Sequence, residues 1–170
     1  MKLYFLVFIF LAVSLSLCDA QEKKPCSDPK YHQFDFWLGQ WNVTRTGKQD
    51  APPAKSKISR LLDQCVIFEE YQSADGKYSG KSLNMFDSEA NVWRQFWVDN
   101  EGGYLYFTGQ FQNDDALHFV SKSEGSDRKV TITRMTFSKM PGDKVHQYID
   151  QSKDNGKTWT VYFDGIYVKR

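Results

Sequence analysis

Polar side chains that can do chemistry interrupt several apolar stretches of this chain. They are Arg94, Gln95, Arg134, His118, His146, Gln147 and Tyr148, accompanied by Trp93 and Trp97. This mixture suits a polar ligand with flat faces, such as a sugar ring stacked on an indole and hydrogen-bonded at its rim. The structural alternatives stay open: the arginines could lie along an outer face with their stems over neighbouring side chains, and the histidines could have partnered, non-catalytic roles.

Several reaction classes lack the residues they require. Hydrolysis of a glycosidic bond needs two carboxylates across that bond, but the candidate acids mostly fall at strand ends or beside turns; they are Glu69, Glu70, Asp99, Asp150 and Asp164. The three histidines show none of the familiar zinc-ligand spacings. Fingerprints of serine hydrolases, P-loop proteins and dinucleotide-binding proteins are also missing. We therefore expect no metal and no cofactor, with haem held by one histidine as an open alternative.

These residues lie on short β-type runs separated by turn signals, without a helical period. The runs after the first are 56–62, 64–71, 78–86, 92–98, 104–111, 116–121, 129–137, 145–150 and 158–168. Their spacing suits antiparallel hairpins, because parallel strands would need long crossovers. Closure into a barrel would remove the exposed edges of so aromatic a sheet. The sequence predicts an all-β fold, a single antiparallel meander barrel of about ten strands, and leaves open which face of each strand points inward.

The aromatic stretch Phe34-Asp-Phe-Trp-Leu-Gly-Gln-Trp41 precedes the β-branched run that continues through Thr44. Its ring content predicts the start of the first strand. Gly39 would allow another backbone or ring to come close, and Trp41 is expected to lie across one end of the closed sheet.

The first residues have the organisation of an export signal. An apolar run from Leu3 to Leu17 follows Lys2 and leads to a small residue, Ala20, before a polar segment. We expect a signal peptide over 1–20, an N-terminal arm over 21–33 and a barrel domain over 34–170, in a periplasmic or secreted protein. A lipoprotein acylated at Cys18 is the alternative, which the bulky Leu17 disfavours.

Charge and cysteine content restrict the partners and the compartment. The formal net charge is +1, and it stays so without the leader, which holds one basic and one acidic residue. Nucleic acid is therefore not expected as a partner, and neither is stable membrane insertion. Cys26 and Cys65 would remain in an oxidising compartment and are predicted to form a disulfide, with a reactive thiol as the alternative. The oligomeric state stays open.

Four sequence blocks together resemble a family of small exported lipocalin-like, calycin-type proteins, mostly of unassigned function. The blocks are 34–41, Asn84-Met-Phe-Asp87, Trp93-Arg-Gln-Phe-Trp-Val-Asp99 and Ser152-x-Asp154-x-Gly156-x-Thr158-Trp159. The resemblance implies a barrel in which a basic residue of the last strand covers the tryptophan of the G-x-W motif. We prefer Arg170 for that contact, although Lys169 is equally close. Such proteins are also associated with polysaccharide degradation, including enzymes that eliminate water from uronic-acid oligosaccharides.

Elimination matches the available residues and would need no cofactor. A basic group, Arg94 or Arg134 with Gln95, would neutralise the uronate carboxylate, while two of His118, His146 and Tyr148 would remove and donate protons. The ligand-binding set would be Trp93, Gln95, Trp97 and Gln147. We therefore expect a lyase of the dehydratase type that acts on the terminal uronic acid of an oligosaccharide. The alternative is a non-catalytic lipocalin-like protein that binds a small molecule.

Overall fold

The computed structural model describes residues 24–170, so the predicted leader and Cys18 lie outside the described part of the chain. Two short 3-10 helices, η1 (Pro29–His32) and η2 (Asp35–Trp37), precede ten strands. The strands are β1 (Gly39–Arg45), β2 (Ala54–Leu61), β3 (Val66–Gln72), β4 (Ser79–Asp87), β5 (Val92–Asp99), β6 (Tyr104–Phe111), β7 (Leu117–Glu124), β8 (Val130–Met140), β9 (Lys144–Ser152) and β10 (Thr160–Lys169). Within 24–170, no helix is long and apolar enough to cross a membrane.

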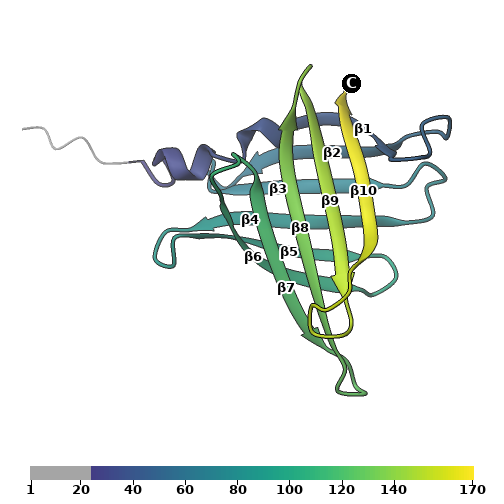
Figure 1. The fold of residues 1–170 in the computed structure, drawn as a ribbon. Coiled ribbons are helices and arrows are strands. Elements are labelled where there is room, and N and C mark those ends of the chain that lie inside the picture. Colours follow the sequence, from purple (N-terminus) through teal and green to yellow (C-terminus); the bar gives the residue numbers. More distant parts are fainter. Residues whose placement is uncertain (1–23) are drawn as a thin grey trace, which may run out of the picture.

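The ten strands form one closed antiparallel barrel, which confirms the predicted fold class (Figure 1). Each strand pairs with its neighbour in sequence, and β10 closes the ring by pairing with β1. Hairpin-sized connections make this meander possible, and closure leaves no unpaired strand edge.

Side chains alternate between the lumen and the outer surface along each strand. On β4, Ser82 and Asn84 are buried, while Leu83 and Met85 between and beside them are about half exposed. Two polar residues and Phe86 therefore face inward on this strand, whereas Leu83 and Met85 face outward. The burial pattern, and not residue polarity, identifies the inward face.

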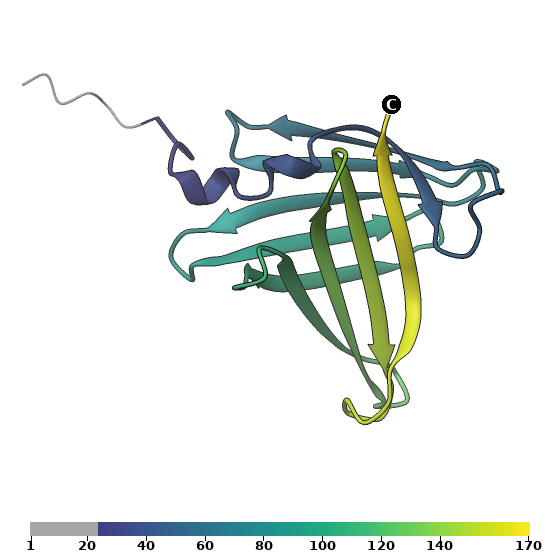
Figure 2. The same ribbon diagram turned by 45° about the horizontal axis from the view of Figure 1, so that its top comes forward.

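An aromatic plug closes one end of the barrel, and it corrects the expectation for the opening stretch. The first strand begins only at Gly39, because the residues before it form η2 and turn across the barrel end (Figures 1 and 2). The Phe34 and Trp37 rings stack at 4.9 Å, and Phe34 also contacts Phe137 at 4.9 Å. Trp41 Nε1 donates a 2.8 Å hydrogen bond to the Trp37 carbonyl. A compact turn buries both leading rings completely, which an extended strand could not do at this position.

A lysine, and not the preferred arginine, covers Trp41. Lys169 lies opposite Trp41 in the β1–β10 register, and its Nζ is 5.5 Å from the indole centroid. Arg170 falls one position further on, where its backbone N–H bonds Gln40. The alternation of side chains along β10 explains the difference.

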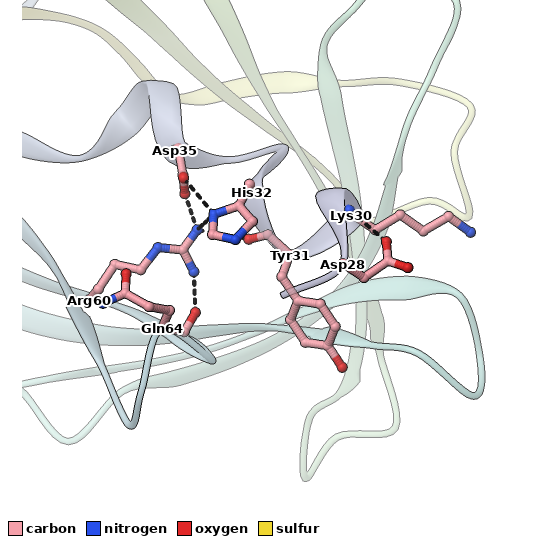
Figure 3. A network of polar contacts seen from close by, with 7 residues as sticks. All are labelled: Asp28, Lys30, Tyr31, His32, Asp35, Arg60 and Gln64. Atoms are coloured by element: carbon pink, nitrogen blue, oxygen red, sulfur yellow. Dashed lines mark hydrogen bonds and ion pairs between the residues drawn. The ribbon is translucent and has the colours of Figure 1, made fainter. Parts of the chain in front are cut away.

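The N-terminal arm is fastened to the plugged end by covalent and polar contacts. The predicted disulfide between Cys26 and Cys65 is present, with Cα atoms 5.2 Å apart. The Arg60 guanidinium, from β2, donates to the Tyr31 carbonyl and the Gln64 carbonyl and pairs with the carboxylate of Asp35 (Figure 3). This Arg60 side chain is only 8% exposed. The arm is therefore a fixed part of the closed end.

Candidate functional site

The two ends of the barrel differ in access. At the plugged end, Phe34 and Trp37 are fully buried. At the opposite end, which we call the mouth, four inward-facing residues are only partly buried: Tyr71, Trp97, Leu105 and Phe163. Since these side chains point into the barrel, their partial exposure means that solvent reaches them at this end. A ten-stranded barrel is also wider than an eight-stranded one, which can already hold one small ligand.

A buried carboxyl group lies inside the barrel below the mouth. Glu69 on β3 is 2% exposed. Ser56 Oγ donates to Glu69 Oε1 at 2.8 Å, and Ser82 Oγ donates to Oε2 at 3.1 Å. Tyr167 Oη donates to Gln147 Oε1 at 2.7 Å and lies 3.4 Å from Glu69 Oε1. Neighbouring strands β2, β4, β9 and β10 thus contribute the groups around this carboxyl.

A chain of neutral amides and hydroxyls extends the contacts of Glu69. Gln95 Nε2 donates to Asn84 Oδ1 at 2.6 Å, and Asn84 Nδ2 lies 2.9 Å from Ser82 Oγ, within hydrogen-bonding distance. The connected side chains, which we call the Glu69 cluster, are Ser56, Glu69, Ser82, Asn84, Gln95, Gln147 and Tyr167. The cluster places an acceptor-rich centre in the middle of an aromatic lumen.

Burial dominates the electrostatics of this cluster. Loss of solvent raises the pKa of Glu69 from 4.5 to about 7, although the bonds from Ser56, Ser82 and Tyr167 oppose that rise. Burial also raises the pKa of Tyr167 well above its ordinary value. At the mouth, burial raises the pKa of Tyr71, against the charge of Arg45 and with that of Glu69. Tyr71 thus lies within electrostatic range of a charged group on each side.

Two aromatic rings pack closely against glycines at the mouth. A Cβ atom added to Gly80 would stand 2.1 Å from Cζ2 of Trp97, and one added to Gly165 would stand 2.4 Å from Cε1 of Phe163. Only glycine allows the rings to approach the backbone so closely. The rings therefore cover the wall of the barrel.

The other groups at the mouth add a third ring and a cation. The Tyr71 and Trp97 ring centroids are 6.3 Å apart. The Arg45 guanidinium carbon, at the end of β1, is 5.1 Å from the Phe163 centroid, and Arg45 itself is exposed. A ligand at the mouth would meet aromatic rings and, at the rim, a positive charge.

The four predicted ligand-binding residues all face inward. Gln95 and Gln147 belong to the Glu69 cluster, and Trp97 lines the mouth. Trp93 lies deeper, with its ring 5.6 Å from Phe34 and its Nε1 bonded to Gln33. Two of the four are thus linked through the Glu69 cluster, and the binding roles of all four remain predictions.

The five predicted catalytic residues all lie on the outer face, so they do not meet in the lumen. Arg94 on β5 bonds Asp87 and Tyr106, both at 2.7 Å. The other four are grouped separately on β7, β8 and β9; they are His118, Arg134, His146 and Tyr148. Each follows or precedes a buried, inward-facing residue on its strand. Because successive side chains point to opposite faces of a sheet, these polar side chains point outward.

Carboxylate partners hold most of this outer group. His118 Nε2 and His146 Nε2 each lie 2.8 Å from a carboxylate, of Asp114 and Asp164 respectively. Arg134 Nε donates to Asp150 at 2.9 Å, and its guanidinium lies 3.4 Å from the Trp159 ring centroid. Within 24–170, no group of three or more possible metal ligands is formed.

From the sequence, the central residue Glu69 is expected only to be an acid near a strand end. It lies in mid-strand, sharing its face with Ile67 and Tyr71, while Glu70 shares the other with Phe68. Because both faces carry apolar residues, alternation alone could not show which glutamate is buried. Comparison with known protein families and with curated proteins gives no match for this chain.

Proposed function

We propose that this protein binds a small organic molecule at the mouth of the barrel. The body of the ligand would contact the rings of Tyr71, Trp97 and Phe163, and its polar end would reach the Glu69 cluster. The observation that carries the proposal is the carboxyl of Glu69, buried beneath an aromatic opening. Binding sites typically combine apolar walls with a few polar groups that fix the orientation of the ligand.

The free-energy cost of burying the Glu69 carboxyl supports a functional reason for its presence. Burying a group that can ionise is unfavourable compared with an apolar residue of the same size, even when hydroxyls compensate part of the loss. Here the other end of the lumen is filled by rings, so an apolar residue at position 69 would fit the same architecture. A ligand that uses the carboxyl would explain why it is there.

We also propose that the protein works outside the cytoplasm, in the periplasm or as a secreted protein, after loss of residues 1–20. The Cys26–Cys65 disulfide supports this, because such bonds persist mainly in oxidising compartments.

Binding can be tested with phenylnaphthylamine, a neutral dye that fluoresces in apolar surroundings. We expect saturable fluorescence that is weakened about tenfold by Trp97→Ala or Tyr71→Ala, since each removes one aromatic wall. Tyr104→Ala is the control, because Tyr104 is 71% exposed on the outer face. Saturable binding that the wall variants and the control affect equally would place the ligand elsewhere, and no binding would contradict the proposal for this dye.

Elimination of water from a uronate-ended oligosaccharide is the second candidate function. The observation that favours it is a carboxyl with a pKa near neutrality, as a general base requires, beside the phenol of Tyr167. In this version Glu69 would remove the proton next to the uronate carboxylate, and Arg45 would neutralise that carboxylate. The phenol of Tyr167 would protonate the hydroxyl group, which leaves as water. The roles expected for the outer-face residues would then pass to groups in the lumen.

This second candidate has a direct optical test. Elimination forms a double bond conjugated to the carboxylate, so ultraviolet absorbance should rise when the protein is mixed with acidic oligosaccharides. Loss of that signal in Glu69→Gln, with retention in His146→Gln, would support a reaction in the lumen. Loss in His146→Gln alone would favour the outer face, and no signal from wild type would reject elimination for the substrates used.

A further inference from the structure

The carboxyl of Glu69 has no positive counter-charge. Its hydrogen-bonding partners are the hydroxyls of Ser56, Ser82 and Tyr167, all of which are neutral. On the neighbouring strands, Lys57 and Lys81 belong to the outer face, where both pair with Glu70. The interior of the barrel thus contains one acidic group whose charge nothing in residues 24–170 balances by contact.

The walls above Glu69 favour positive charge as well. Tyr71, Trp97 and Phe163 present aromatic rings, and the negative face of a ring attracts cations, most strongly where water is excluded. The chain already uses this attraction at the mouth, where the Arg45 guanidinium carbon lies 5.1 Å from the Phe163 centroid. A deep carboxyl and a ring-lined approach are the two features that recognise an organic cation.

We propose that the ligand of this barrel is an organic amine, a small molecule whose protonated nitrogen pairs with Glu69 while its flat or apolar body lies between the mouth rings. The inference rests on the proposed binding function, because it uses the same mouth. It adds the chemical class of the ligand, and hence the charge that the site selects.

The opposite charge is disfavoured by the same groups. An anion reaching the cluster would lie beside Glu69 in a poorly hydrated interior, where repulsion between like charges is strong. A neutral ligand could fill the mouth but would leave the charge of the Glu69 carboxylate unbalanced. An ammonium group brings up to three N–H donors, which match the acceptor oxygens of the cluster.

Arg45 weakens but does not reverse this preference. Its guanidinium is exposed at the rim, where water and salt screen its charge, whereas Glu69 is buried. Removing the arginine should therefore strengthen amine binding by a factor of about two to five. A simple amine that binds less tightly to Arg45→Ala than to wild type would contradict the proposed direction of approach.

The test compares tryptamine with ethylindole, which has the same ring and nearly the same shape but no charge. Isothermal titration at about pH 8, where Glu69 is ionised, should show tryptamine binding at least about tenfold more tightly to wild type. Glu69→Gln should reduce that preference to less than about twofold while keeping ethylindole binding. Glu70→Gln, on the outer face of the same strand, is the matched control and should keep the preference.

The pH dependence of the preference for tryptamine provides a second readout that needs no variant. The preference should fall at about pH 6, because Glu69 takes up its proton as the pH drops through about 7. The groups facing Glu69 are Ser56, Ser82 and Tyr167. Tyr71 lies at longer range and is itself influenced by the charge of Arg45. The pKa values of both tyrosines are raised, so neither titrates in this interval.

The outcomes separate this inference from the function on which it rests. Equal affinity of wild type for the two indoles would overturn the amine class and leave small-molecule binding intact. A preference that survives in Glu69→Gln would overturn the pairing with Glu69. Binding of neither indole, together with no binding of phenylnaphthylamine, would overturn both proposals.

Discussion

Replacing Glu69 by glutamine is expected to stabilise the folded protein at neutral pH and to change little in acid. The substitution keeps the shape of the side chain and removes its charge. In the wild type, burial raises the pKa of Glu69 from 4.5 to about 7. Since one pH unit corresponds to about 1.4 kcal/mol, keeping this group ionised in the folded state costs roughly 3 kcal/mol.

The direction of the change in stability with pH follows from the protons bound by Glu69 in the folded and unfolded chains. Below about pH 4.5 the carboxyl is protonated in both the folded and the unfolded chain, so it contributes no penalty. Between about 4.5 and 7 the unfolded chain ionises while the folded protein keeps its proton, and stability therefore falls as the pH rises. Above about pH 7 the penalty is constant.

Urea unfolding, followed by tryptophan fluorescence, measures this effect directly. The free energy of unfolding of Glu69→Gln minus that of wild type should rise by about 3 kcal/mol between about pH 4 and pH 8. Taking the difference cancels the other titrating groups. Glu70→Gln removes only exposed ion pairs and should change stability by no more than about 1 kcal/mol at any pH. A difference between Glu69→Gln and wild type that stays flat with pH would refute the raised pKa.

Three further perturbations test how the barrel is held and opened. Arg60→Ala should lower stability by about 2 kcal/mol, because it removes a nearly buried charged donor from the arm, and hydrogen exchange over residues 29–37 should accelerate. The double variant Cys26→Ser with Cys65→Ser should lose about 4 kcal/mol in thermal unfolding, given the sequence separation of 39 residues. Gly80→Ala should displace the Trp97 ring, which would shift its fluorescence and weaken phenylnaphthylamine binding, whereas unchanged values would show that the wall can give way.

The barrel could be predicted because its turns are specified by short local sequences. Asp75-Gly76 and the similar polar breaks set hairpin-sized intervals, and such intervals exclude parallel crossovers. The disulfide followed from two cysteines behind an export-like leader. Both features depend on spacing along the chain, which the sequence displays directly.

The plug at the barrel end could not be predicted in the same way. Phe34 to Trp41 is rich in rings, as strands are, but Phe34 and Trp37 are buried by turning across the end of the closed sheet. That environment exists only after all ten strands have assembled. Tertiary packing therefore decided the local structure, against the strand propensity of the residues.

Gln95 and Gln147 were expected as ligand-binding residues, but the rest of the Glu69 cluster could not be predicted, because the usual hydrophobic alternation is reversed on one of its walls. On β4, Ser82 and Asn84 point inward while Leu83 and Met85 point outward. Aromatic rings from other strands pack into the barrel core, so small and polar residues are accommodated on this wall. On β5, both faces carry rings, and Arg94 turns outward as Gln95 turns inward. Chain-level patterns cannot show which face the rest of the barrel covers.

The most direct measurement of the binding proposal is a map of amide chemical shifts during titration with tryptamine. A ligand site at the mouth predicts that the largest changes occur around Tyr71, Trp97 and Phe163 and extend to Glu69. Changes centred instead on the outer face around His146, with the mouth unaffected, would contradict it.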